Sequence, residues 1–193
     1  MNLPNKLTIL RIVLVPFLLV MIYNIGDSFL MSVLTAMLFL LISFTDMLDG
    51  KIARKYNLIT NFGKFIDPLA DKFMVLGSMF AILAWMLLRG ETTVAIIYVF
   101  VALLILLREL GVTSIRLVVA GKDGIVVAAS ILGKIKTVSQ MVGTVIIIVE
   151  PILPFFGGSR VLSYIGMGVM LFTTMVSGID YLKAYLPYID SNK

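Results

Sequence analysis

Long apolar stretches alternate with short polar ones along the whole chain. Six stretches are apolar enough to predict membrane helices, at residues 7–23, 29–45, 68–88, 92–107, 137–149 and 161–179. Polar or glycine-containing turns separate several of them, such as residues 24–27 and 89–91. About 20 apolar residues in a helix cross a bilayer. The pattern therefore predicts an all-α integral membrane protein, a six-transmembrane-helix bundle that forms a single domain over residues 1–193.

The first apolar stretch follows a basic start, so it also has to be weighed as a signal peptide. Arg11 interrupts the stretch, and no small-residue cleavage site follows Tyr23. We therefore expect this segment to stay in the protein as a membrane span.

The composition agrees with this fold and narrows the chemistry. Apolar residues make up 60% of the chain and charged residues 14%, against about 45–50% and about 25% in soluble domains. A water-soluble globule and a disordered chain are excluded. The sequence has neither cysteine nor histidine, which excludes disulfides, thiol nucleophiles, Ser-His-Asp triads and most zinc sites. Catalysis must therefore use carboxylates, Lys, Arg, hydroxyls, amides or a bound metal.

Basic residues are distributed unevenly about the predicted spans. Six spans place both termini on the same side as segments 46–67 and 108–136, and this side carries 14 of the 16 Lys and Arg residues; Arg89 and Arg160 are the other two. Basic residues stay on the cytoplasmic side of membrane proteins, so we expect both termini and the active site to face the cytoplasm from the cell membrane. The net charge of +5 indicates contact with anionic membrane lipid rather than with nucleic acid.

Four aspartates flank the connection between the second and third spans, and two of them begin a polar stripe. Asp46, Asp49, Gly50, Ala53 and Arg54 are offset by 0, 3, 4, 7 and 8 positions. These offsets describe one face of an α-helix. The face would present two acids, two small residues and one arginine to the same neighbour.

A second stripe follows eight residues later. Gly63, Asp67 and Asp71 recur every four positions, so they share a helical face if the helix has begun by Gly63. Pro68 opposes such an early start, because inside a helix its ring clashes with the carbonyl four residues before it. We expect the helix to begin near Asp67 or to bend there.

The two stripes would bring together more negative charge than a solvated helix end usually carries. Pairing with nearby lysines would explain one acid, but two unit charges about 4 Å apart repel by about 4 kcal/mol at an effective dielectric of about 20. Divalent cations with oxygen ligands compensate such repulsion, and paired cations are typical of sites that displace phosphoryl groups. The glycines allow a ligand close to the backbone, and the fork of arginine suits phosphate. The residues predict a site for metal and phosphate.

The complete stripe reads Asp-x2-Asp-Gly-x2-Ala-Arg-x8-Gly-x3-Asp-x3-Asp from Asp46 to Asp71. It resembles the signature of the CDP-alcohol phosphatidyltransferases, membrane enzymes that move a phosphatidyl or similar group from a CDP-linked donor to an alcohol. This resemblance implies a homodimer with two divalent metals, Mg²⁺ or Mn²⁺, in each active site. The metal ligands would be Asp46, Asp49, Asp67 and Asp71, the last of them also the general base on the acceptor hydroxyl. The residues at the CDP group would be Gly50, Ala53, Arg54 and Gly63.

Polar residues of the first span lie at the same membrane face. Asn5, Thr8 and Arg11 are three positions apart, which makes a short helical stripe. We assign Asn5 and Thr8 to the donor site on this basis.

Basic residues of the fourth and fifth spans indicate an acceptor with its own phosphate. Burying them beside the carboxylates requires an anion, and the candidates are Arg108, Arg116, Lys134 and Lys136. Glycerol 3-phosphate would supply that anion, whereas serine, choline and ethanolamine would not. Anchoring to lipid headgroups is the alternative interpretation.

Three further segments resemble one branch of the family and make the acceptor prediction more specific. Residues 5–11, 108–113 and 133–137 resemble the phosphatidylglycerophosphate synthase branch of the family. The resemblance implies CDP-diacylglycerol and glycerol 3-phosphate as substrates, with phosphatidylglycerophosphate and CMP as products. An inositol phosphate, or phosphatidylglycerol as in a cardiolipin synthase, stays open as the acceptor.

An ion or metal transporter is the competing class, because transporters also place acids in membrane spans. The aspartates cluster at one membrane face, and no ionisable residue lies mid-span in the second, third, fifth or sixth span. This distribution disfavours an ion path. Metal flux into liposomes would indicate transport, whereas CMP release from CDP-diacylglycerol would indicate the enzyme.

Overall fold

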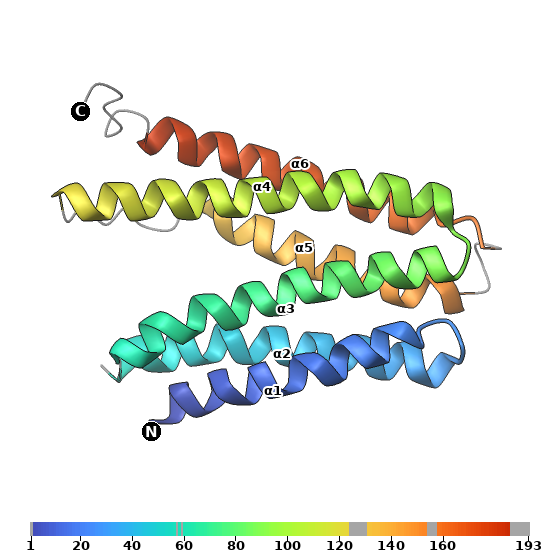
Figure 1. The fold of residues 1–193 in the computed structure, drawn as a ribbon, viewed down its shortest axis with the longest axis horizontal. Helices are drawn as coiled ribbons and strands as arrows, with labels where there is room; N and C mark the ends of the chain where they lie inside the picture. The colour runs from blue at the N-terminus through green and yellow to red at the C-terminus, as the bar shows by residue number, and fades with distance from the viewer. Residues whose placement is uncertain (1, 57, 59, 124–130, 154–157, 186–193) are drawn as a thin grey trace.

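A computed structural model describes residues 2–56, 58, 60–123, 131–153 and 158–185 of the chain. These residues form six long helices and one short 3-10 helix, which Figure 1 labels in chain order. Their bounds are α1 (Leu3–Tyr23), α2 (Phe29–Lys55), α3 (Asn61–Leu88), α4 (Thr92–Asp123), α5 (Ile131–Val149), η1 (Glu150–Ile152) and α6 (Val161–Tyr185).

The six-span prediction is confirmed, since all six long helices have the length and apolar character needed to cross a membrane. The helices extend beyond the predicted apolar stretches at the polar ends. In particular, α3 begins at Asn61, so the expected start near Asp67 is wrong. Pro68 lies inside this helix, and Gly63, Asp67 and Asp71 share one helical face.

Polar side chains explain where the helices begin. Asn2, Ser28 and Thr60 precede α1, α2 and α3, and each accepts a hydrogen bond from a backbone N–H of the first turn. Such caps satisfy donors that have no partner within the helix. At Thr60 the cap is a 2.9 Å bond from the N–H of Gly63. This bond starts α3 early enough to hold the second acidic stripe.

The helices divide into two groups of three, α1–α3 and α4–α6 (Figure 1). Within the groups, α1 packs on α2 and α3, and α6 packs on α4 and α5; α2 meets α5 and α3 meets α4 across the seam. Buried side chains such as Leu18, Ile42, Ile82 and Ile147 form a core that runs through both groups. Helix α1 begins and α6 ends at the same end of the bundle. We call this the aspartate end, because Asp46, Asp49, Asp67 and Asp71 lie there.

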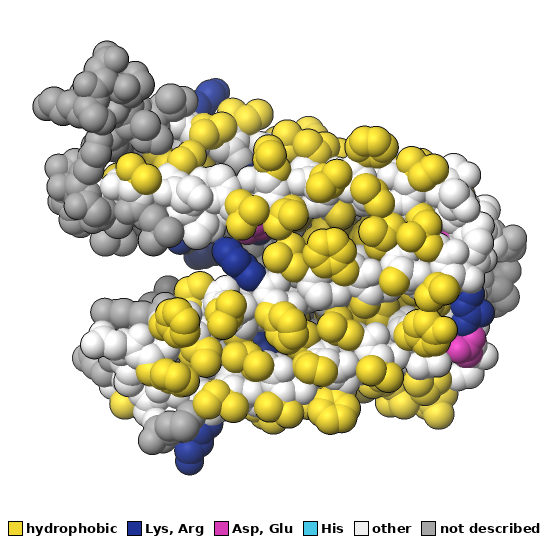
Figure 2. Space-filling model, viewed as in Figure 1, with side chains coloured by type: hydrophobic (Ala, Val, Ile, Leu, Met, Phe, Trp, Pro, Cys, Tyr) yellow, Lys and Arg dark blue, Asp and Glu magenta, His cyan; other side chains and the backbone are white. Residues whose placement is uncertain are grey.

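The outer surface is apolar along the length of the helices. Figure 2 shows hydrophobic side chains over both groups, and large exposed examples are Phe17, Phe80, Phe100 and Phe172. Apolar side chains on the outside are stable where the solvent is lipid, so the chain is a multi-pass membrane protein. Figure 2 also shows a notch between the two groups at the aspartate end, with Lys and Arg side chains at its inner edge.

Candidate active site

Helix α1 connects the two acidic stripes through Thr8. The Thr8 hydroxyl is fully buried and lies 2.7 Å from Oδ1 of Asp67 on α3 and 3.5 Å from Oδ2 of Asp49 on α2. One hydroxyl donates one proton at a time, and the shorter distance assigns it to Asp67. The structure thus brings an acid from each stripe to the same side chain, while the role of Thr8 at the donor stays a prediction.

Arg11 neutralises the other side of the acidic cluster. Its side chain is fully buried, and its guanidinium forms ion pairs with Asp46 (Nη1 to Oδ1, 2.5 Å) and with Asp49. Sequence reasoning placed Arg11 in the stripe with Asn5 and Thr8 but gave it no role. The sequence does contain a signal for Arg11. It lies three positions after Thr8, and it is a charged residue within an apolar stretch.

Asn5 fixes the beginning of α3 against α1. Its side-chain nitrogen donates to the Thr60 hydroxyl at 3.1 Å. A Cβ atom at Gly63 would lie 3.0 Å from the Asn5 Oδ1 and 3.2 Å from the Thr60 Oγ1. A side chain at Gly63 would therefore force the Asn5 and Thr60 side chains to shift. Thr60 itself was not predicted as a site residue.

The remaining predicted donor residues lie at the end of α2. Gly50 and Ala53 are half-buried in the last turns of this helix, beyond Asp49. The side chain of Arg54 falls outside the part of the structure that is described, so its contact with a phosphate stays a prediction.

Asp71 differs from the other aspartates. It is half-buried, and its carboxyl forms no hydrogen bond or ion pair with the described residues. It lies within electrostatic reach of Asp46 on α2 and of Lys136 on α5. Asp71 is therefore the acid positioned between the acidic cluster and the second group of helices.

The donor chemistry of the four aspartates fits hard divalent cations, since all offer carboxylate oxygens from two adjacent helices. Among the described residues, however, no three acidic side chains are close enough to form a metal site as they stand. The ion pairs of Arg11 occupy Asp46 and Asp49 instead. If these acids hold a metal, their side chains would have to rearrange first.

Two of the four predicted acceptor residues come together around an acid on α4. Glu109 pairs with the buried Lys136 of α5 and with Arg108, whose Nη1 lies 3.2 Å from Glu109 Oε1. Arg108 also donates to the Ser177 hydroxyl of α6 at 2.6 Å. Sequence reasoning assigned no role to Glu109 or Ser177, because the contacts of Glu109 with Lys136 and of Ser177 with Arg108 join different helices.

The other two basic residues lie at the edge of this group. Arg116 is exposed and donates to the Tyr181 hydroxyl at 3.1 Å, while Arg108 lies over the same ring, 5.4 Å from its centroid. Lys134 is exposed and has no side-chain partner among the described residues. The structure thus joins Arg108, Lys136 and Arg116 through shared partners and leaves Lys134 apart.

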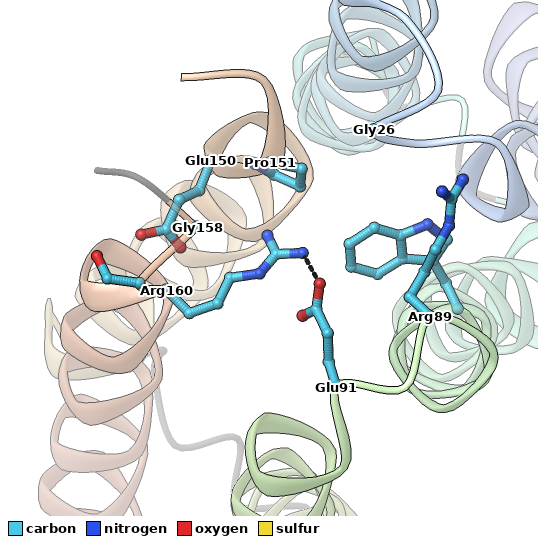
Figure 3. A pocket seen from close by; sticks show the side chains of 9 residues that line it. Gly26, Arg89, Glu91, Glu150, Pro151, Gly158 and Arg160 are labelled. Atoms are coloured by element: carbon cyan, nitrogen blue, oxygen red, sulfur yellow. Dashed lines mark hydrogen bonds and ion pairs between the residues drawn. The ribbon is translucent and has the colours of Figure 1, made fainter. Parts of the chain in front are cut away.

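One cavity of about 190 Å³ lies at the opposite end of the bundle (Figure 3). There Arg160 pairs with Glu91 and stacks on Trp85, 4.9 Å from the ring centroid. Glu150 accepts hydrogen bonds from the backbone N–H groups of Leu162 and Ser163, which caps α6. These contacts stabilise the turns between the helices at this end. None of the predicted site residues lines the cavity.

Comparison with known proteins gives matches over most of the chain. A family model described as CDP-alcohol phosphatidyltransferase matches residues 1–177. The CDP-diacylglycerol–glycerol-3-phosphate 3-phosphatidyltransferase of Bacillus subtilis (strain 168) is 39% identical, and the match covers 94% of this chain and 94% of its own length. The protein of the same name from Rickettsia typhi is 38% identical and covers 97% of this chain and 98% of its own length. A probable phosphatidylglycerophosphate synthase of Mycobacterium tuberculosis is 37% identical, covering 96% of this chain and 82% of its own length.

Proposed function

Because the chain belongs to the CDP-alcohol phosphatidyltransferase family, we propose that it transfers the phosphatidyl group of CDP-diacylglycerol to glycerol 3-phosphate. The products are phosphatidylglycerophosphate and CMP. The names of the similar proteins support this donor and acceptor. The observation that carries the proposal is the opposition of an acidic cluster on α1–α3 to a basic group on α4–α6 at the aspartate end.

The acidic cluster serves the donor in this proposal. Two Mg²⁺ or Mn²⁺ ions per site would be held by Asp46, Asp49, Asp67 and Asp71. Such ions neutralise a pyrophosphate and polarise its phosphorus–oxygen bonds. Thr8 orients the Asp67 carboxylate through its 2.7 Å hydrogen bond. The CDP group would be surrounded by Gly50, Ala53, Arg54, Gly63 and Asn5.

Asp71 acts as the general base. Its carboxyl has no ion-pair partner among the described residues, so an oxygen is available to accept the proton of the acceptor hydroxyl. The acceptor oxygen that has lost this proton then attacks the phosphorus of the phosphatidyl group. The bond between this phosphorus and the CMP oxygen breaks, and CMP leaves with its electrons. The electrostatic influence of Lys136 on Asp71 supports a base that lies next to the basic group.

The basic group serves the acceptor. Lys136 and Arg108 would bind the phosphate of glycerol 3-phosphate by charge-assisted hydrogen bonds, with Arg116 and Lys134 at the edge. In the structure Glu109 pairs with both Lys136 and Arg108. The acceptor phosphate would replace the Glu109 carboxylate between Lys136 and Arg108.

The membrane orientation follows from charge. We place the aspartate end in the cytoplasm, since 14 of the 16 basic residues belong to that side. CDP-diacylglycerol keeps its acyl chains in the bilayer there, while glycerol 3-phosphate and CMP exchange with the cytosol. The protein would act in the cell membrane as a homodimer.

An acceptor panel tests this function. Protein purified in detergent is given CDP-diacylglycerol and Mg²⁺ with glycerol 3-phosphate, glycerol, an inositol phosphate or phosphatidylglycerol, and both CMP and the lipid product are measured. We expect rapid reaction with glycerol 3-phosphate alone. Equal reaction with glycerol would contradict the phosphate site, and preference for another alcohol would reassign the acceptor.

Chelation tests the metal requirement separately. EDTA should abolish CMP release, and Mg²⁺ or Mn²⁺ should restore it, because the carboxylates alone repel the donor pyrophosphate. Transfer that continues in EDTA would remove the metals from the proposal while leaving the reaction in place.

A further inference from the structure

Arg11 carries a permanent positive charge in the mainly apolar helix α1. Its side chain is fully buried, and its Nε has no hydrogen-bond partner among the described residues. A guanidinium does not lose its proton in proteins, and a buried charge without a partner is costly. Its ion pairs with Asp46 and Asp49 therefore explain how it is tolerated in this state.

The same carboxylates are the predicted ligands of a divalent cation. Arg11 contacts Oδ1 of Asp46 and Oδ2 of Asp49, one oxygen from each acid of the α2 stripe. A cation on these acids would stand next to the guanidinium, and the two like charges would repel at close range. Arg11 and the metal thus compete for Asp46 and Asp49.

We propose that Arg11 exchanges partners during the reaction: it balances Asp46 and Asp49 in the metal-free protein and turns to the donor's pyrophosphate when metal binds. This inference rests on the proposed metal dependence. Once displaced, the guanidinium needs another anion within the same buried region. The donor brings a pyrophosphate, whose oxygens match the fork of the guanidinium and its free Nε. Arg11 thereby couples metal occupancy to donor binding.

Direct measurement of Mn²⁺ binding tests the competition without turnover. Free Mn²⁺ is counted by electron paramagnetic resonance in detergent solutions of the wild type and of Arg11→Met, which keeps the length and removes the charge. Without its competitor, we expect the variant to bind Mn²⁺ about tenfold more tightly. Binding of CDP-diacylglycerol to the Mn²⁺-loaded variant, measured without acceptor, should weaken about tenfold or more.

Two further variants give the controls. Arg89→Met removes an arginine that pairs with Asp27 at the opposite end of the bundle, and it should change neither affinity. Arg11→Lys keeps the charge but not the fork that spans two carboxylates, so its Mn²⁺ affinity should fall between wild type and Arg11→Met. This conservative variant also provides the test if Arg11→Met does not fold.

The outcomes separate the two proposals. Equal or weaker Mn²⁺ binding by Arg11→Met or Arg11→Lys, with normal binding by the wild type, overturns the exchange and makes Arg11 a support for the ligands. Failure of the wild type to bind Mn²⁺ at all overturns the metal dependence itself. Tighter Mn²⁺ binding with unchanged donor affinity would disprove the transfer of Arg11 to the pyrophosphate.

Discussion

The ammonium of Lys136 on α5 forms an ion pair with the carboxylate of Glu109 on α4, and the Lys136 side chain is only 9% exposed. Arg108 pairs with the same carboxylate. Both cations are thus aligned before any substrate arrives. In the proposed acceptor site, a phosphate would meet donors whose positions the neighbouring helices already hold.

Lys136→Met should impair use of the acceptor specifically. Hydrogen bonds to charged groups contribute about 1.5–3 kcal/mol, so kcat/KM for glycerol 3-phosphate should fall on the order of 10–100-fold, while CDP-diacylglycerol binding stays nearly constant. Steady-state kinetics with each substrate varied in turn measures this. Lys134→Met is the matched comparison and should have a smaller effect, because Lys134 is exposed. Equal losses for donor and acceptor would mean that the basic residues anchor lipid instead.

Asp71→Asn should leave the donor bound and stop its reaction. The amide preserves the shape of the side chain but cannot take up the acceptor proton, and general-base catalysis typically contributes about 10²–10⁴-fold. Turnover and CDP-diacylglycerol binding are measured on the same preparation. Asp27→Asn, which alters an acid at the opposite end of the bundle, should keep the wild-type rate. A fast Asp71→Asn enzyme would require a different base.

Gly63→Ala should separate α1 from α3. The new Cβ would lie 3.0 Å from the Asn5 Oδ1 and 3.2 Å from the Thr60 Oγ1, and overpacking of this kind costs about 1–3 kcal/mol. We expect a lower midpoint of thermal unfolding and weaker donor binding. Gly168→Ala is the control, since nothing lies within 4 Å of its added Cβ. Equal stability of the two variants would contradict the close packing.

Cysteine labelling tests the orientation, because the chain has no cysteine of its own. Thr92 and Lys183 are exposed near opposite ends of the bundle. A membrane-impermeant thiol reagent added to intact cells should label Thr92→Cys, and it should reach Lys183→Cys only after the membrane is opened. The reverse pattern would turn the aspartate end to the outside.

Hydropathy and helical periodicity are local properties, which is why the six spans and both acidic stripes could be predicted from the sequence. The helix ends were harder, since α3 begins where Thr60 offers a cap rather than where the apolar residues begin. The ion pair of Arg11 with Asp49 joins residues 38 positions apart, and Glu109 meets Lys136 only because α4 and α5 lie in the same group. Such partners depend on tertiary packing, and no spacing within one helix predicts them.

The grouping of the helices has a consequence for how the chain can be divided. All four aspartates belong to α1–α3 and the whole basic group belongs to α4–α6, and the turn at residues 89–91 is the only covalent link between these halves. Lys72 of α3 donates to the Thr113 hydroxyl of α4 at 3.2 Å across the seam. A single cut in that turn would place the proposed donor and acceptor sites on two separate polypeptides, and activity would then report on their reassembly in the bilayer.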